Sequence, residues 1–190
     1  KRKRPAAMTK ESVQKIPYEK ILISERQIQQ AVRRITEQVN AYYAQADEAI
    51  ALVLLEGARY FARDLLAGVQ FPIQTEYLEA DSYKGATRSC GTVEIRDSQK
   101  LRQKIEGKQV LVIDDIYDTG LTLSAVMEWV RACRPAEIKT CVFLEKRVPH
   151  QKQISIDFLG MRIEDVFVIG YGLDYQNRYR QLPFIAVLSI

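Results

Sequence analysis

One short segment, residues 110–122, holds most of the side chains that could do chemistry together. Four apolar residues predict a strand in the centre of a sheet, two adjacent carboxylates follow, and a polar loop leads into a helix. The polar residues of this segment are Asp114, Asp115, Asp118, Thr119, Gly120 and Thr122. The unpaired N–H groups of a helix N-terminus bind phosphate, and carboxylates accept hydrogen bonds from vicinal sugar hydroxyls. The segment therefore predicts a site for a sugar phosphate.

Two other kinds of site combine a strand with acidic residues, and the spacing disfavours both. A phosphoacceptor signalling domain has its acidic pair after its first strand, whereas this strand starts near residue 110. A phosphatase that forms an aspartyl phosphate needs Asp-x-Asp, whereas Asp115 and Asp118 are three positions apart. Two carboxylates at the end of a buried strand are costly unless they have partners, which favours a functional role.

The elements around this segment predict an α/β fold. Residues 24–27, Ser-Glu-Arg-Gln, form a capping box that begins an amphipathic helix running to about Ala46. Apolar strands then alternate with helices, a pattern typical of a central, mainly parallel sheet flanked by helices. Further helices are expected at 58–67 and 121–134, and strands at 49–55, 71–80, 92–96, 110–113, 139–144, 156–159, 166–169 and 184–190. In such sheets the ligand lies beyond the carboxyl ends of the strands.

Histidine and cysteine usage excludes several kinds of chemistry. The chain has one histidine, His150, and three cysteines, Cys90, Cys133 and Cys141. A single histidine without a Cys-x-x-Cys pair disfavours a zinc site and removes most Ser-His and Cys-His schemes. An odd number of thiols is typical of reduced cysteines and predicts a cytoplasmic protein. Catalysis must then use carboxylates, lysine, backbone amides or a hard metal ion.

Composition and charge describe an ordinary globular domain with a basic arm. Of the 190 residues, 47% are hydrophobic and 27% charged. The longest apolar run, residues 49–55, is far shorter than the roughly 20 residues of a membrane span, so no membrane is expected. Residues 1–10 carry five basic groups and no acid, whereas the rest of the chain has 23 Lys and Arg against 24 Asp and Glu. We interpret residues 1–20 as a basic N-terminal arm, in part a cloning remnant or a solvated tail, and residues 21–190 as the domain.

Several stretches together resemble a known family. Residues 110–122 resemble the ribose-phosphate signature of the phosphoribosyltransferases. Further stretches are similar, in the same order, to the 6-oxopurine (hypoxanthine-guanine) branch of that family. They are Leu54-Leu55-Glu56-Gly57-Ala58, Ser82-Tyr83-Lys84-Gly85, Phe143-Leu144-Glu145-Lys146, and residues 167–175 with 178–183. The resemblance covers about residues 20–190.

The resemblance implies a fold and a reaction. The fold is that of the type I phosphoribosyltransferases, with a small hood formed by the N- and C-terminal segments. The reaction is purine salvage: hypoxanthine or guanine combines with 5-phosphoribosyl-1-pyrophosphate to give IMP or GMP and pyrophosphate. The implied cofactor is Mg²⁺, which prefers oxygen ligands. The implied assembly is a homodimer or homotetramer, with small-molecule substrates and no nucleic-acid partner.

The resemblance also implies roles for the residues of the acidic segment. Asp114 and Asp115 hold the ribose hydroxyls and, with Asp174, ligate the metal. Asp118 belongs to the ribose-phosphate site and is the general base beside N7 of the purine. The residues that cradle the 5-phosphate are Thr119, Gly120, Leu121 and Thr122.

Base and pyrophosphate contacts come from other parts of the chain. By resemblance, Lys146 donates to the exocyclic oxygen of a 6-oxopurine, which selects against adenine. The other implied purine contacts are Ile116, Phe167, Val168 and Asp174. The implied pyrophosphate contacts are Leu55, Glu56, Gly57 and Arg180. Ser82 and Tyr83 are expected to begin a mobile loop, residues 81–92, that closes over the site.

Glu56 departs from the family pattern. The family often has Lys or Arg at this position, in a loop that often contains a cis peptide bond. A carboxylate pointing inward would repel pyrophosphate, so we expect Glu56 to point outward or across a subunit interface.

Two alternative functions use the same fold. One is a regulator that senses nucleotides or binds RNA, which the basic arm favours. The retained Asp118, Lys146, Asp174 and Arg180 argue against it, because a binding module needs no general base and no pyrophosphate clamp. The other is a transferase specific for adenine or a pyrimidine, which Lys146 and Phe167 disfavour.

Overall fold

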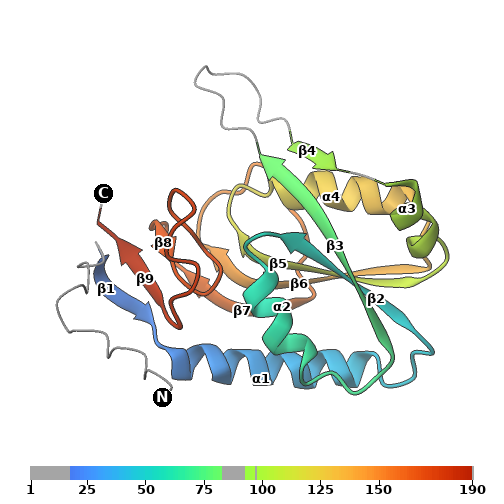
Figure 1. Ribbon diagram of the computed structural model, residues 1–190, viewed down its shortest axis with the longest axis horizontal. Coiled ribbons are helices and arrows are strands. Elements are labelled where there is room, and N and C mark those ends of the chain that lie inside the picture. Colours follow the sequence, from blue (N-terminus) through green and yellow to red (C-terminus); the bar gives the residue numbers. More distant parts are fainter. Residues whose placement is uncertain (1–17, 83–92, 97, 190) are drawn as a thin grey trace, which may run out of the picture.

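A six-stranded sheet forms the centre of the computed structural model, which describes residues 18–82, 93–96 and 98–189 (Figure 1). The strand order is β4-β3-β2-β5-β6-β7. The bounds are β2 (Ala49–Leu55), β3 (Ile73–Ser82), β4 (Val93–Arg96), β5 (Gln109–Tyr117), β6 (Glu137–Lys146) and β7 (Phe158–Ile163). Neighbouring strands are parallel except β3 and β4, which confirms the predicted mainly parallel sheet.

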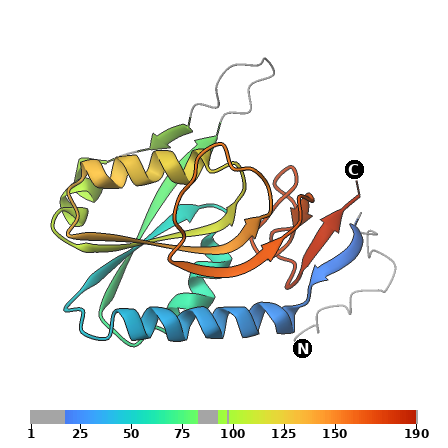
Figure 2. The same cartoon turned by 180° about the vertical axis from the view of Figure 1, so that it is seen from behind.

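Helices cover both faces of this sheet (Figures 1 and 2). α1 (Glu25–Tyr42) and α2 (Arg59–Leu66) pack on one face, and α3 (Gln99–Ile105) and α4 (Leu121–Ala132) pack on the other. Alternate residues of β2 enter two separate cores: Ala49, Ala51 and Val53 with α1 and α2, and Ile50, Leu52 and Leu54 with α3 and α4. A strand buried on both faces is apolar throughout, which is the pattern that predicts residues 49–55.

The first helix begins where the sequence predicts. The side chain of Ser24 accepts a hydrogen bond from the Gln27 main-chain N–H, and the Gln27 side chain accepts one from the Ser24 N–H. The capping box is therefore confirmed, although α1 ends at Tyr42 rather than near Ala46. Among the helices described, none is long and apolar enough to cross a membrane.

A second, smaller sheet forms the predicted hood at one end of the molecule (Figure 2). Its antiparallel strands are β1 (Tyr18–Ile23), β9 (Ile185–Leu188) and β8 (Val168–Ile169), with β9 in the middle. The hood thus joins the N- and C-terminal parts of the described chain, as expected. Because β1 begins at Tyr18, residues 18–20 belong to the hood although the sequence assigns them to the arm.

The sequence does not predict two of the elements, and it underestimates the length of several strands, β5 among them. The strand β1 has mostly exposed residues and only a short apolar run at residues 21–23, and α3 is a short helix with only Leu101 and Ile105 buried. The strand β5 was expected to end at Ile113 but continues to Tyr117, because its pairing with β6 extends that far. The carboxylates at 114 and 115 are therefore part of the strand itself and not of a following loop.

Candidate active site

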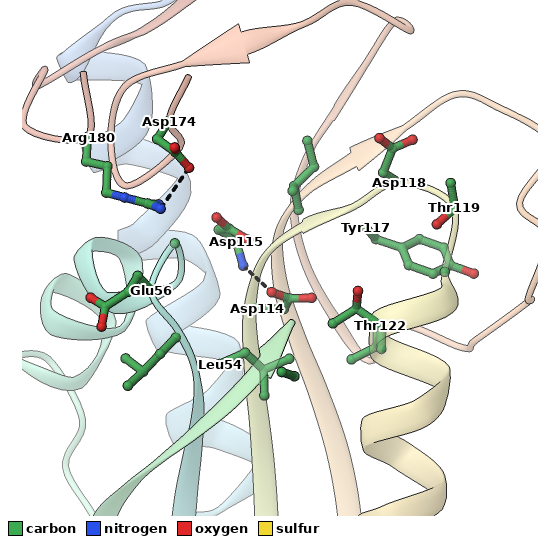
Figure 3. Close-up of a pocket in the computed structure, with 16 residues that line it drawn as sticks. Leu54, Glu56, Asp114, Asp115, Tyr117, Asp118, Thr119, Thr122, Asp174 and Arg180 are labelled. Carbon is green, nitrogen blue, oxygen red and sulfur yellow. Dashed lines mark hydrogen bonds and ion pairs between the residues drawn. The ribbon is translucent and has the colours of Figure 1, made fainter. Parts of the chain in front are cut away.

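A cavity of about 440 Å³ opens at the carboxyl ends of β2 and β5 (Figure 3). This is the edge at which a parallel sheet places ligands. The predicted site residues that line it are Leu55, Glu56, Gly57, Asp114, Asp115, Ile116, Asp118, Thr119, Gly120, Thr122, Asp174 and Arg180. The predicted residues Leu121, Lys146, Phe167 and Val168 are described but lie outside this lining. Tyr83 lies outside the described residues, and Ser82 is the last residue of β3.

The floor of the cavity is a pair of carboxylates in β5. Asp114 is buried and Asp115 half-buried, and the Asp115 main-chain N–H donates to Asp114 Oδ1 at 2.9 Å. Burial, together with the neighbouring charge of Asp115, raises the pKa of Asp114 well above its ordinary value. Burial also raises the pKa of Asp115. Such a pair is stabilised by a ligand that donates hydrogen bonds or carries positive charge.

The loop from β5 to α4 forms one wall. Gly120 is the N-cap of α4 and has a left-handed backbone with φ +83°. A Cβ at this position would lie 2.2 Å from the Lys152 carbonyl oxygen, so only glycine fits. The N-cap has no side chain to accept from the first helical amides, and Thr119 and Thr122 add hydroxyls to the cavity. This end of α4 has the features of an anion site.

An ion pair lies beside this loop. Lys146 Nζ is 3.1 Å from Asp118 Oδ2 and 3.2 Å from Asp165 Oδ1. The Lys146 side chain is only 11% exposed, whereas that of Asp118 is 46% exposed. A largely buried cation at the end of β6 thus holds a carboxylate that solvent, or a ligand, can still reach.

The loop from β2 to α2 approaches the carboxylate pair closely. A Cβ on Gly57 would lie 1.7 Å from Asp115 Oδ2, so only glycine allows the backbone to come this close to the carboxylate. The Leu55–Glu56 peptide bond is cis. The Glu56 carboxylate turns away from Asp115 and lies 3.4 Å from Arg59 Nη2, with both side chains more than half exposed (Figure 3). The expected outward orientation of Glu56 is confirmed.

The opposite wall comes from the segment between β8 and β9. Arg180 Nη2 is 2.8 Å from Asp174 Oδ1, and its Nη1 donates to the Gly172 carbonyl at 2.6 Å. The Asn177 main-chain N–H donates to Asp174 Oδ2 at 2.7 Å. A Cβ on Gly172 would lie 2.1 Å from the Gly57 carbonyl oxygen, so this segment packs directly on the β2–α2 loop. Asp174 and Arg180 are thereby fixed together at the cavity.

The remaining predicted purine contacts differ in exposure. Phe167 is 38% exposed and meets the Tyr175 ring edge-on at 5.7 Å between centroids. Val168 is buried in β8 opposite Val187 of β9. Ile116 is half-buried and lines the cavity. An exposed aromatic ring is available to stack on a planar ligand.

Comparison with known proteins identifies the family. A family model described as "Phosphoribosyl transferase domain" matches residues 20–176. The hypoxanthine-guanine phosphoribosyltransferase of Bacillus subtilis is 38% identical over 171 residues, covering 90% of this chain and 93% of that protein. The chain belongs to the hypoxanthine-guanine phosphoribosyltransferase family. The resemblance seen in the sequence motifs is confirmed.

Other relatives of this phosphoribosyltransferase agree in sequence and in fold. The hypoxanthine-guanine-xanthine phosphoribosyltransferase of Tritrichomonas foetus is 34% identical over 172 residues, covering 90% of this chain and 92% of that protein. A crystal structure of a hypoxanthine phosphoribosyltransferase from Staphylococcus aureus superposes with a TM-score of 0.82 at 31% identity, covering 91% and 92% of the two chains. The type I fold is confirmed.

Sequence reasoning missed the residues behind the β5–α4 loop of this phosphoribosyltransferase. Tyr117, the last residue of β5, is buried, and its hydroxyl donates to the Lys152 carbonyl at 2.6 Å and accepts from the Ile154 N–H at 2.9 Å. His150 lies against the Tyr117 ring, with 4.1 Å between centroids. The sequence offers no periodicity around residues 148–154, so no pattern could connect them to residues 117–120.

The donor set of this phosphoribosyltransferase suits a hard cation shared with substrates. The described residues contain no group of three or more His, Cys, Asp or Glu that could hold a metal ion, so Asp114, Asp115 and Asp174 do not converge as one protein cage. Mg²⁺ usually takes one or two carboxylates, with substrate phosphates completing its shell. The buried pair Asp114–Asp115, whose pKa values are raised by burial, fits that arrangement.

Proposed function

We propose that the protein transfers the phosphoribosyl group of 5-phosphoribosyl-1-pyrophosphate to hypoxanthine or guanine, giving IMP or GMP and pyrophosphate. The observation that carries this proposal is the ion pair between Lys146 and Asp118, placed next to the anion site at the start of α4. It supplies a proton acceptor and a hydrogen-bond donor where a base linked to a bound ribose phosphate would lie.

The ribose phosphate binds along β5 and α4. The 5-phosphate accepts hydrogen bonds from the loop amides and from the hydroxyls of Thr119 and Thr122, and Gly120 and Leu121 contribute backbone amides. Asp114 and Asp115 accept from the ribose hydroxyls. The cavity volume of about 440 Å³ lies within the range of small-molecule sites.

The base binds between β6 and the hood. Asp118 removes the proton from N7 of the purine while another ring nitrogen forms the bond to C1 of the ribose and the bond to pyrophosphate breaks. Lys146 donates to the exocyclic oxygen at C6. An adenine amino group would leave this buried donor without an acceptor, which disfavours adenine. Phe167 and Ile116 pack on the base, and the Val168 backbone contacts its edge.

Pyrophosphate lies between the β2–α2 loop and the hood wall. The backbone of Leu55, Glu56 and Gly57 approaches it, and Arg180 contributes positive charge. We propose Mg²⁺ as the cofactor, with Asp114, Asp115 and Asp174 as the residues that face it. When bound, Mg²⁺ stabilises the negative charge that develops on the leaving pyrophosphate.

We further propose a cytoplasmic homodimer or homotetramer. The chain has an odd number of cysteines, and Cys133 and Cys141 are buried in the core, which fits a reducing compartment. A surface beside α2 exposes Tyr77 to 53% and includes Tyr60 and Leu66, which suits a contact with a second copy. Light scattering of the purified protein tests the assembly: a monomer at micromolar concentration would contradict it.

The first experiment is an assay of the reaction with a panel of bases. The protein is incubated with Mg²⁺, 5-phosphoribosyl-1-pyrophosphate and hypoxanthine, guanine, xanthine, adenine or uracil, and nucleotide is measured by chromatography. We expect product from hypoxanthine and guanine and little from adenine. Product from no base, with nucleotide still bound, would contradict the proposal and favour a nucleotide-sensing regulator.

Two variants assign the roles within that assay. Asp118→Asn removes the proton acceptor and should lower kcat by about 100-fold or more, because general-base catalysis contributes that much. Lys146→Ala should reduce the preference for hypoxanthine over adenine. Unchanged turnover in the first variant, or unchanged base preference in the second, would remove the role assigned to that residue.

A further inference from the structure

Residues 117–120, which connect β5 to α4, are called the phosphate loop here. A segment far from them in the sequence is hydrogen-bonded to this loop. We call residues 148–154, between β6 and β7, the brace. The main-chain N–H groups of Gln151 and Lys152 donate to the Thr119 carbonyl at 2.9 and 3.2 Å. The His150 ring nitrogen Nδ1 is hydrogen-bonded to the Asp118 carbonyl. Two consecutive carbonyls of the phosphate loop are therefore held by the brace.

Holding those carbonyls fixes the amides that follow them. In a trans peptide unit the C=O and the next N–H point in opposite directions within one rigid plane. The Asp118 carbonyl faces His150, so the Thr119 N–H faces the other way. The Thr119 carbonyl faces Gln151 and Lys152, so the Gly120 N–H also points away from the brace. Thr119 and Gly120 line the cavity, and these amides are therefore aimed at the place where an anion would bind.

Only one of these contacts depends on a side chain, that of His150. A carbonyl oxygen only accepts, so Nδ1 carries the proton of this hydrogen bond. The His150 ring is fixed by packing on Tyr117 and is 14% exposed. Its Nε2 lies 3.7 Å from Glu145 Oε1, and the other oxygen of Glu145 accepts from Arg162 Nε at 2.7 Å. The ring is thus held between Tyr117 and Glu145, and Glu145 is itself held by Arg162.

We propose that His150 is a positioning residue for 5-phosphate recognition, acting through the Asp118–Thr119 peptide. This rests on the proposed function, because it assumes that a sugar phosphate binds at the start of α4. The histidine touches no substrate. It keeps the Thr119 and Gly120 amides oriented toward the cavity in the free protein, so that phosphate binding does not have to order them.

A matched pair of substitutions separates the hydrogen bond from packing. Asn and Leu have nearly the same shape, but Asn places Nδ2 where His has Nδ1, whereas Leu has no donor. Calorimetry measures the affinity of wild type, His150→Asn and His150→Leu for GMP and for guanosine, which lacks the phosphate. We expect His150→Leu to weaken GMP binding about tenfold, the usual size of one lost hydrogen bond, and His150→Asn to stay within about twofold of wild type. Guanosine binding should not change.

Specific results would overturn the inference. His150→Leu binding GMP as tightly as wild type would do so, as would His150→Asn binding as weakly as His150→Leu, since packing alone would then explain the effect. If wild type itself binds no GMP, the proposed function fails together with the inference. A measurement on wild type alone does not depend on how the variants fold: in ¹H–¹⁵N spectra the Thr119 and Gly120 amide resonances must shift on addition of GMP, and unchanged resonances would contradict the proposal.

Discussion

The two walls of the cavity are built in opposite ways. On the β5–α4 wall, the residues at 114–122 are consecutive in the chain, begin in a buried strand and end in a helix. On the hood wall, the segment from Tyr171 to Arg180 is a series of tight turns with little regular structure. Four of its non-glycine residues have positive φ: Tyr171, Gln176, Asn177 and Tyr179.

This difference separates two tasks within one site. The β5–α4 wall, residues 114–122, is called the phosphate wall below. Its side chains and amides are precisely positioned because they lie on elements that the sheet core holds rigid. The hood wall gains its geometry from contacts between turns, such as that of Arg180 with Asp174, so changes there can alter ligand binding with less damage to the core. Variants on the two walls should accordingly affect stability and substrate affinity in different proportions.

The largest effect is expected on the phosphate wall, from Gly120→Ala. The added Cβ meets the Lys152 carbonyl at 2.2 Å while the backbone keeps φ +83°, so the loop must move. We expect kcat/KM for 5-phosphoribosyl-1-pyrophosphate to fall about 100-fold and Tm to fall by several degrees. The control is Gly107→Ala, which has φ +71° but nothing within 4 Å of the new Cβ. It should lose a little stability and keep its activity; equal kinetics in the two variants would contradict the close fit at Gly120.

A smaller and different effect is expected on the hood wall, from Arg180→Gln. The variant loses the ion pair with Asp174 and the hydrogen bond to Gly172. Steady-state kinetics should show KM for 5-phosphoribosyl-1-pyrophosphate rising about tenfold, while Tm changes by less than about 2 °C, since the side chain is partly exposed. The matched control is Arg178→Gln, two residues earlier and exposed. A large loss of Tm in Arg180→Gln would remove the proposed distinction between the walls.

Asp114→Asn tests how much the buried carboxylate of Asp114 lowers the stability of the folded protein. The pKa of Asp114 is raised in the folded protein, so the unfolded chain releases this proton at lower pH than the folded one does. Stability therefore falls as pH rises above the ordinary value near 4 and levels off above the folded pKa. At pH 8 without divalent ions, the variant should have a Tm higher by about 3 °C, or about 1 kcal/mol for a domain of this size.

The same variant should have a flatter dependence of Tm on pH. Calorimetric scans between pH 4 and pH 8 measure this. Asp165→Asn is the control, because it makes the same Asp-to-Asn change at a carboxylate that is 66% exposed. A wild-type Tm that does not decline over this range would contradict the burial penalty assigned to Asp114.

The smallest effect is expected at the rim, from Glu56→Lys. Glu56 and Arg59 are both more than half exposed, so their ion pair contributes only about 0–1 kcal/mol. Reversing this charge should lower KM for 5-phosphoribosyl-1-pyrophosphate about threefold at low salt, and less at 0.5 M salt because of screening. Glu106→Lys makes the same change in net charge near the start of β5, away from the cavity, and should leave KM unchanged.

The parts of the site that follow from the sequence are those made by local physics. The apolar run at 49–55 predicts β2 to the residue, and the acids, threonines and glycine after residue 113 predict the phosphate wall. The Ser24 capping box likewise predicts the start of α1. Each of these depends on neighbours within a few residues, so its pattern is visible in one short window.

The parts that do not follow are made by contacts between distant residues. The strand β1 forms because it pairs with β9, and nothing in residues 18–23 alone reveals that partner. The brace contacts the phosphate loop across more than thirty residues, as in the hydrogen bond of Tyr117 with Ile154. His150 lies in a polar stretch in the sequence, and its place beside Asp118 exists only in the folded chain.

The position of β9 in the middle of the hood has a consequence for synthesis of the chain. Both other hood strands, β1 near the start and β8, pair with β9, which consists of residues 185–188. While the ribosome makes the chain, all strands of the six-stranded sheet are made before β9, because β7 ends at Ile163. The first strand must wait unpaired until β9 has been made. The residues of the phosphate site are therefore all made before the hood can form.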